Sequence, residues 1–116
     1  MKYMALIYSA RDAGPSYGTP EFEAMMQGYF AATEAFEKAG VLVAGDGLQG
    51  VETATCLRVR EGQSETMDGP FAETKEQLGG YYIFECADLD EALKYAAMIP
   101  TVEYGTVELR PVAEYG

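Results

Sequence analysis

Two segments of this sequence, residues 2–8 and 81–87, are apolar on both of the faces that a β-strand presents. Successive side chains of a strand point to opposite sides, so a half-exposed strand alternates apolar with polar residues. The alternating sets here are Tyr3, Ala5 and Ile7 against Met4, Leu6 and Tyr8, and Tyr81 and Ile83 against Tyr82, Phe84 and Cys86. Strands of this kind belong in the middle of a sheet that is covered on both sides. We therefore predict that the two segments are the central strands of one sheet.

A helix is predicted over residues 20–39. Thr19 can accept a hydrogen bond at its start, Pro20 suits the first helical position, and Gly40 suits the residue that ends a helix. Residues at helical spacing form one stripe along it, namely Phe22, Met25, Met26, Tyr29, Phe30, Thr33 and Phe36. We interpret the stripe as core packing against the sheet. The alternative is that its Met and Phe residues line a ligand pocket.

The rest of the chain supplies a second helix and further strands. Asp88 and Glu91 form a capping-box pattern at the helix start, and Pro100 ends it. Its predicted buried stripe is Ala92, Leu93, Ala96, Ala97 and Ile99. Strands are predicted at residues 41–44, broken by Gly45-Asp46-Gly47, at 53–60 and 64–68 as a hairpin, and at 106–112. This α+β order is the ferredoxin-like plan, βαββαβ, with an antiparallel sheet and an inserted β-hairpin.

Two helices can cover only one face of such a sheet. The central strands, which are apolar on both faces, therefore require a second cover, and no predicted element is left to supply it. We expect a second copy of the chain to fill that place. The sequence thus predicts a homodimer that pairs through its sheet faces.

The length and charge of the chain exclude several classes of partner. Its 116 residues suit a single domain, residues 1–116. The net charge of −11, with only eight Lys and Arg residues, argues against nucleic acid and against anionic membrane surfaces. Neither a signal peptide nor a membrane-spanning stretch is recognisable in the sequence. A cytoplasmic location is therefore expected.

The sequence contains no histidine. This removes the commonest general base, the commonest transition-metal ligand, and every Ser-His or Cys-His nucleophile. Cys56 and Cys86 are too few for a disulfide framework or a zinc site, and both are interpreted as small thiols within strands. Neither a metal site nor a cofactor is predicted.

The stretch from Asp68 to Gly80, DGPFAETKEQLGG, concentrates acidic and basic side chains between glycines. Pro70 suits the first position of a helix, and Asp68 or Gly69 can cap it. We expect a turn, about two helical turns, and then an exit through Gly79-Gly80 into a strand. Asp68 would lie at the end of the preceding strand, where side chains often point into a cleft.

DGPFAETKEQLGGYYIFE resembles the signature of the DGPF subgroup of YCII-related proteins, small bacterial proteins of mostly unassigned biochemistry. The resemblance also takes in MKYMALIY, AGVLVAGDGL, ATCLRVREG, DLDEALKYAAMIP and TVELRPV, in that order. It implies a ferredoxin-like fold that dimerises into an α/β-barrel-like assembly. In the broader family a His paired with an Asp is the proposed catalytic centre. Because this chain has no His, only Asp68 carries over.

The site prediction centres on Asp68 as the catalytic candidate, with a structural cap for the backbone N–H of Phe71 or Ala72 as its alternative. Arg110 is a plausible clamp for a carboxylate-bearing ligand, and Lys75 could meet Asp68 or Glu108. The predicted ligand-binding residues are Phe71, Glu73, Lys75, Tyr82, Glu108 and Arg110.

Two functions are weighed. The first is a small-molecule binding protein or weakly characterised enzyme, with its pocket between the sheet and the DGPF loop. The second is a non-catalytic regulatory partner, since DGPF-type proteins are commonly encoded beside extracytoplasmic-function sigma factors, and acidic charge would suit a basic partner surface. The sequence leaves open whether the chain is an enzyme.

Overall fold

The two segments with two apolar faces form the central strands of a four-stranded sheet in the computed structural model, which describes residues 1–115. β1 (Lys2–Ser9) pairs antiparallel with β5 (Gln77–Glu85). The outer strands are β2 (Leu42–Gly47) and β6 (Thr106–Pro111), so the order is β2-β5-β1-β6. Every pairing is antiparallel. The predicted α+β class is confirmed, and the topology is compatible with the ferredoxin-like plan.

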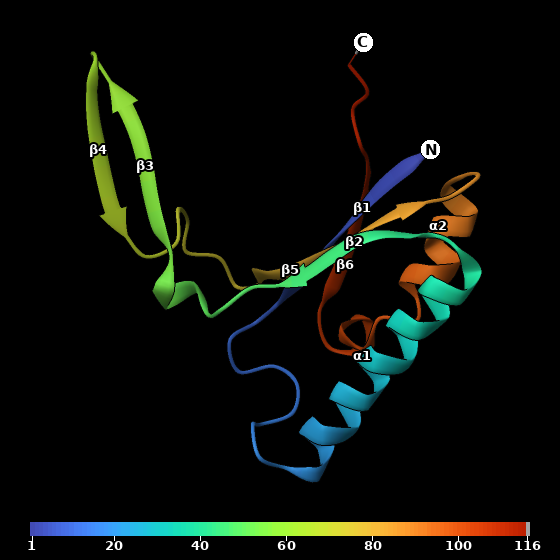
Figure 1. Cartoon of the computed structure of the whole chain (residues 1–116). Coiled ribbons are helices and arrows are strands. Elements are labelled where there is room, and N and C mark those ends of the chain that lie inside the picture. Colours follow the sequence, from blue (N-terminus) through green and yellow to red (C-terminus); the bar gives the residue numbers. More distant parts are fainter. Residues whose placement is uncertain (116) are drawn as a thin grey trace.

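Both helices lie on the same side of this sheet (Figure 1). α1 (Pro20–Ala39) begins as predicted, because the Phe22 N–H donates to the Thr19 hydroxyl at 3.1 Å. It ends at Gly40, whose φ of 73° is the left-handed conformation that favours glycine. α2 (Leu89–Ala96) is followed by a 3₁₀ turn, η2 (Pro100–Glu103). α2 stops short of the predicted residue 99, and Leu93 and Ala97 are exposed rather than buried.

The hydrophobic core lies between the helices and one face of the sheet. Phe36 of α1 is fully buried, with its ring 5.2 Å from that of Tyr82 and 4.9 Å from that of Phe84. Ala5 lies opposite Tyr82 in the register of β1 and β5, so both point to this covered face. The other buried apolar residues are Tyr3, Ile7, Ala32, Val41, Cys86, Ala92, Ala96 and Ile99.

The other face of the sheet carries apolar side chains that neither α1 nor α2 covers. We call it the open face, formed by Met4, Leu6, Tyr8, Tyr81 and Ile83, all of which are only half-buried. The register places Met4 opposite Ile83 and Leu6 opposite Tyr81, so these side chains form one continuous surface.

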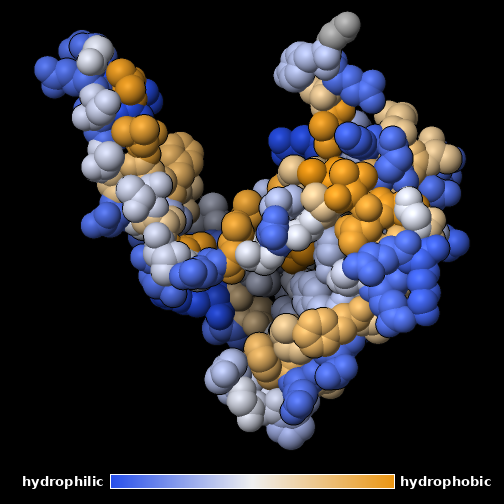
Figure 2. Space-filling view, in the orientation of Figure 1, coloured by the Kyte–Doolittle hydropathy of each residue, from blue (hydrophilic) through white to orange (hydrophobic). Residues whose placement is uncertain are grey.

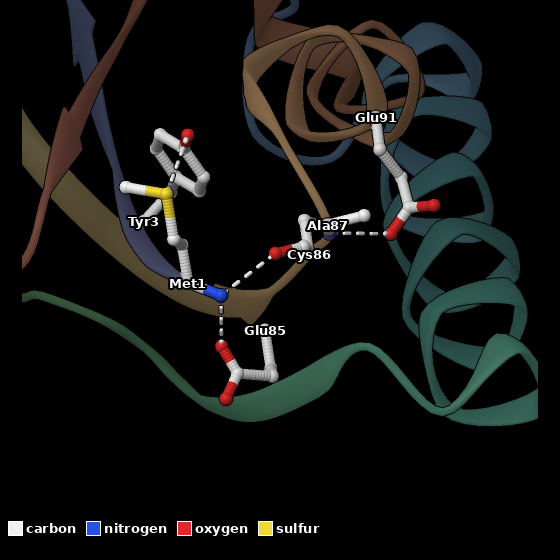
Figure 3. Close-up of polar contacts among 6 residues, drawn as sticks. All are labelled: Met1, Tyr3, Glu85, Cys86, Ala87 and Glu91. Atoms are coloured by element: carbon white, nitrogen blue, oxygen red, sulfur yellow. Dashed lines mark hydrogen bonds and ion pairs between the residues drawn. The ribbon is translucent and has the colours of Figure 1, made fainter.

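Figure 3 shows how the start of β1 is held to the end of β5. The ammonium group of Met1 donates to the carbonyl oxygen of Cys86 at 2.9 Å and lies 3.0 Å from Oε2 of Glu85. The predicted capping pattern is also present. The Glu91 N–H donates to Asp88 Oδ1 at 2.9 Å, and Glu91 Oε1 accepts from the Ala87 N–H at 3.2 Å. These bonds fix where α2 begins relative to the core strands.

The remaining two strands stand apart from the body, after a 3₁₀ turn, η1 (Val51–Thr53). β3 (Thr55–Arg60) and β4 (Gln63–Asp68) pair only with each other, as a separate two-stranded sheet that we call the arm (residues 55–68). Glu61 and Gly62 connect them with φ angles of 52° and 77°. Two positive φ values in a two-residue loop match the twist of a hairpin.

The predicted helix after Asp68 is wrong. Residues 69–76 form bends and loop, and β5 begins at Gln77, so Gly79 and Gly80 lie inside a strand. A helix of two turns is marginal in water unless one face packs, and residues 71–75 of this segment are all exposed. The Thr74 hydroxyl instead bonds the carbonyl oxygen of Glu76 at 2.6 Å, a local contact that competes with helix formation.

The predicted break at Gly45-Asp46-Gly47 is also wrong, because β2 continues through these residues. β5 supplies their partners, with Gly45 opposite Tyr82 and Gly47 opposite Gly80. A Cβ atom on Gly45 would lie 2.6 Å from the Tyr82 ring. Glycine is therefore required here by close approach rather than by a turn. None of the helices described in residues 1–115 is both long and apolar enough to cross a membrane.

Candidate ligand cavity

A cavity of about 600 Å³ lies between α1 and one end of the four-stranded sheet, and Thr101 and Tyr104 complete its wall. Its floor is hollow because glycines occupy positions that face α1. Gly45 lies opposite Tyr82, and Gly47 opposite Gly80, and cross-strand partners share a face. Tyr82 belongs to the covered face, so the three glycines do as well. A side chain at Gly47 would enter open space, whereas the Tyr82 ring lies against Gly45 and the backbone of Asp46 lies against Gly80.

The helical stripe of α1 forms the opposite wall. Met25, Met26, Tyr29, Phe30 and Thr33 line the cavity, whereas Phe36, at the far end of the stripe, is in the core. The core interpretation of the stripe is confirmed for Phe36, whereas its residues from Met25 to Thr33 face a cavity. Phe22 does neither and packs against Tyr17. The spacing alone could not separate the two, since it shows which face of the helix points inward and not what lies opposite.

Hydroxyl groups meet inside this cavity. The Thr33 and Tyr82 hydroxyls lie 2.8 Å apart, joining α1 to β5. The Tyr29 hydroxyl forms a short hydrogen bond with Thr101 of η2. Tyr104 donates to the Met25 sulfur and lies 3.5 Å from the Thr101 hydroxyl. The site thus offers several hydroxyls that can donate to or accept from a ligand.

Burial raises the pKa of the Tyr29 phenol, with its hydrogen bond to Thr101 acting in the opposite direction. The group is therefore a neutral hydroxyl at physiological pH and does not supply a phenolate. On β5, the Tyr81 hydroxyl donates to Asp46 Oδ2 at 2.8 Å, and this hydrogen bond raises the pKa of Tyr81. Neutral phenols are hydrogen-bonding groups first and acid–base groups only at alkaline pH.

The charged residues around the cavity are acidic. Glu37 and Asp46 contribute to its lining, and among the described residues neither Lys nor Arg does. The carboxylate of Asp46 is engaged by Tyr81, its cross-strand partner on the open face, and Glu37 forms no ion pair within residues 1–115. An anionic ligand would therefore find no charge partner in this wall.

Of the residues predicted from sequence, Tyr82 is the one that lines the cavity. Asp68 is exposed at the end of β4, and its carboxylate makes no hydrogen bond to Phe71 or Ala72 in the part of the chain that the structure describes. Phe71, Glu73 and Lys75 follow in the exposed loop, with 76% of Phe71 accessible.

Glu108 and Arg110 lie on β6, where Arg110 Nη2 is 2.6 Å from Glu108 Oε2. They are opposite Leu6 and Met4, so they border the open face. Within a single chain the predicted residues thus fall in three separate places: the cavity, the base of the arm, and the rim of the open face. The ion pairs within residues 1–115 do not include one between Lys75 and Asp68 or Glu108.

Sequence reasoning missed Tyr29, Thr33, Thr101 and Tyr104 as polar groups of a site. Tyr29 and Thr33 carried a usable signal, because two hydroxyls four residues apart on an otherwise apolar stripe mark polar groups that will face inward. Thr101 and Tyr104 carried none, since they reach the cavity only through the turn after α2.

This chain is similar to known proteins over almost its whole length. Residues 1–115 match the model of the YCII-related domain. An uncharacterized protein of Rhizobium meliloti (strain 1021) is 38% identical over 117 residues, which cover 99% of this chain and 94% of that protein.

Proposed function

The chain belongs to the YCII-related domain family, and from this premise we propose that it binds an uncharged small molecule in the cavity between α1 and the sheet. Its Asp68-Gly69-Pro70-Phe71 motif supports assignment to the DGPF subgroup. The observation that carries the proposal is the cavity itself, which has open space at Gly47, where an added Cβ atom would meet no atom within 4 Å. A protein interior ordinarily fills such a space with side chains.

The dimensions and lining of the cavity suit a small organic ligand. About 600 Å³ falls within the ordinary range of ligand pockets, which is roughly 300–1,000 Å³. Such pockets combine an apolar wall with a few convergent polar groups. Here the Met and aromatic side chains of α1 supply the wall, and the hydroxyls of Tyr29, Thr33 and Tyr82 supply the polar groups.

The ligand's charge follows from the acidic surroundings. The sequence suggested a carboxylate-bearing ligand with Arg110 as its clamp, but Arg110 is paired with Glu108 on a strand that does not line the cavity. Burying an anion without a charge partner is costly. A neutral ligand meets no such cost, and a cationic one is tolerated near Glu37.

Three probes of nearly equal shape test the proposal: benzyl alcohol, benzylamine and benzoate. In ¹H–¹⁵N NMR titrations at millimolar concentration, benzyl alcohol is expected to shift the amide signals of Gly45, Gly47 and Thr33, and benzoate to leave them in place. Tighter binding by benzoate, or no movement of these signals by any probe, would contradict the proposal.

A filled-cavity variant provides the matched control. A Cβ at Gly47 meets no atom within 4 Å, so Gly47→Leu can extend into the cavity without a backbone clash. It is expected to weaken benzyl alcohol binding by about tenfold or more, whereas Gly47→Ala, which removes the same glycine but little space, retains most of it. Equal binding by both variants would place the probe elsewhere.

We also propose that two copies pair through their open faces, in the manner of a dimeric α/β barrel. The support is the continuous apolar surface of Met4, Leu6, Tyr8, Tyr81 and Ile83, which neither helix covers. A stable interface of standard size buries about 1,600 Å² in total. Light scattering at micromolar concentration is expected to give twice the chain mass of 12.6 kDa, and a monomer mass would contradict the pairing.

A further inference from the structure

Within residues 1–115 the arm lies outside the hydrophobic core, and Phe71 from the following loop lines a small hollow beside its Cys56 and Met67. The core contains no residue from it, and every residue of β4 is exposed. Leu57 and Val59 of β3 are 68% and 55% accessible. A lone two-stranded hairpin is marginally stable in water, and exposed aliphatic side chains at its centre mark a contact surface.

The two sides of the arm differ in character. The register places Leu57 opposite Thr66 and Val59 opposite Ser64, giving a side with aliphatic side chains at its centre and one carboxylate, that of Asp68 opposite Thr55, at its base. The other side alternates Cys56 and Met67 with charged groups, among which Arg58 lies opposite Glu65. We call the first side, formed by Leu57, Val59, Ser64 and Thr66, the apolar side of the arm. Alternation of this kind is the pattern of a strand that buries one face.

The shape of the molecule indicates where the partner lies. The radius of gyration is 16.2 Å, whereas a compact domain of this length has about 13 Å. In Figure 1 the helices lie on one side of the four-stranded sheet and the arm rises on the other, leaving a wide gap between arm and body. Figure 2 shows the same gap between the space-filled arm and body, with apolar surface along the arm.

We propose that the arm is a clasp for a second copy of this chain: a copy seated on the open face is gripped by the arm, whose apolar side packs against it. The inference rests on the proposed pairing of open faces. In a twofold dimer the same contact forms twice, so each subunit holds the other.

Charge supports a second copy as the occupant. Arg58 and Arg60 form no ion pair within residues 1–115. Outside the arm, acidic residues far outnumber basic ones, and the whole chain carries a net charge of −11. Both arginines lie on the side of the arm opposite Leu57 and Val59, so they can reach acidic groups of a second copy only around the edge of the contact, where they would fix its orientation.

The arm's contribution is tested by the double variant Leu57→Ser/Val59→Ser, with Met67→Ser on the charged side as the control. All three positions are exposed and lie outside the core, so the body folds in each variant. In sedimentation equilibrium, the double variant is expected to raise the dimer dissociation constant by about tenfold or more, and the control by less than about threefold. Equal effects of the two, or no effect of the double variant, would overturn the clasp.

Crosslinking separates the clasp from the pairing on which it rests. A photoreactive p-benzoylphenylalanine in place of Leu57, in an equal mixture of ¹⁴N and ¹⁵N chains, is expected to give crosslinked peptides that join the two isotopes. If the chain is dimeric but every crosslink stays within one isotope, the clasp is wrong and the pairing stands. If the protein is monomeric, both fail.

Discussion

The body and the arm both contain strands with apolar faces. They differ because the body covers one such face with its own helices, whereas the arm covers none. In the body, β1 and β5 bury one apolar face under two helices and leave a second apolar face open. In the arm, β3 has one apolar side, and that side is open too. An apolar pattern states that a face must be covered, but it does not state by what. Only the body's first face finds its cover within the chain.

The strongest test of this comparison truncates one apolar side chain in each region, a buried one in the body and an exposed one in the arm. Phe36→Ala deletes a fully buried side chain that packs edge-on against three aromatic rings, and is expected to lower the free energy of unfolding by about 3–5 kcal/mol. Leu57→Ala in the arm should change it by less than about 0.5 kcal/mol under conditions where the chain is monomeric. Urea denaturation at low protein concentration measures both. A large loss at Leu57 in the monomer would show that the arm packs within its own chain.

The sequence predicts the part of the molecule that packs within the chain better than the parts that stay open. The covered face could be predicted because periodicity, helix caps and strand order are local or nearly local signals, as at Thr19, Gly40 and Asp88. The helix expected after Asp68 does not form. Proline and cap preferences favour a helix start, but a short helix also needs a surface to pack on, and this segment has none. Tertiary packing decides such short helices, and that information is not in the segment.

The cavity could be predicted only in fragments. The glycines at 45 and 47 predict a break in the strand, but both lie within β2, where Gly45 admits the Tyr82 ring and Gly47 leaves open space. Tyr82 is among the predicted ligand-binding residues, and the structure places it in the cavity lining. The sequence does not show that β2 pairs with β5. This pairing brings Gly47 and Gly80 together at the cavity.

Within the body, Thr33→Val sharpens the contrast between a polar site and a core. The change keeps the shape of the side chain but leaves the Tyr82 hydroxyl, 2.8 Å away, without its partner. An unsatisfied buried hydroxyl costs about 1–3 kcal/mol, and the value here is expected near the lower limit because the cavity admits water. Thermal unfolding with and without a second change, Tyr82→Phe, is the measurement. The double variant should recover part of the loss, and if it does not, the two hydroxyls are not coupled.

At the junction of arm and body, Asp68 is expected to matter less for folding than a true cap does. Thr19→Ala removes the hydroxyl that accepts the Phe22 N–H, and should cost about 1 kcal/mol. Asp68→Ala and Asp68→Asn should each stay within about 0.5 kcal/mol of the parent, because the exposed carboxylate caps no helix in residues 1–115. Thermal unfolding of the three variants at pH 7 compares them. A loss at Asp68→Ala equal to that at Thr19→Ala would restore the structural role proposed for Asp68.

The smallest expected effect is a pH dependence that belongs to the body alone. Burial holds the pKa of Tyr29 above its ordinary value of 10.0, so its neutral form is favoured in the folded chain. The unfolded chain releases this proton at lower pH than the folded one. Stability from Tyr29 is therefore fully present below pH 10 and is lost as pH rises through the folded pKa.

We expect the stability difference between the parent and Tyr29→Phe to be constant from pH 7 to 9 and to move in favour of Tyr29→Phe above pH 10. The arm contains no tyrosine, so Leu57→Ser/Val59→Ser should follow the parent curve throughout. Urea titrations at each pH measure the difference, and parallel curves for parent and Tyr29→Phe up to pH 11 would show that the Tyr29 phenol is as free to ionise in the fold as out of it.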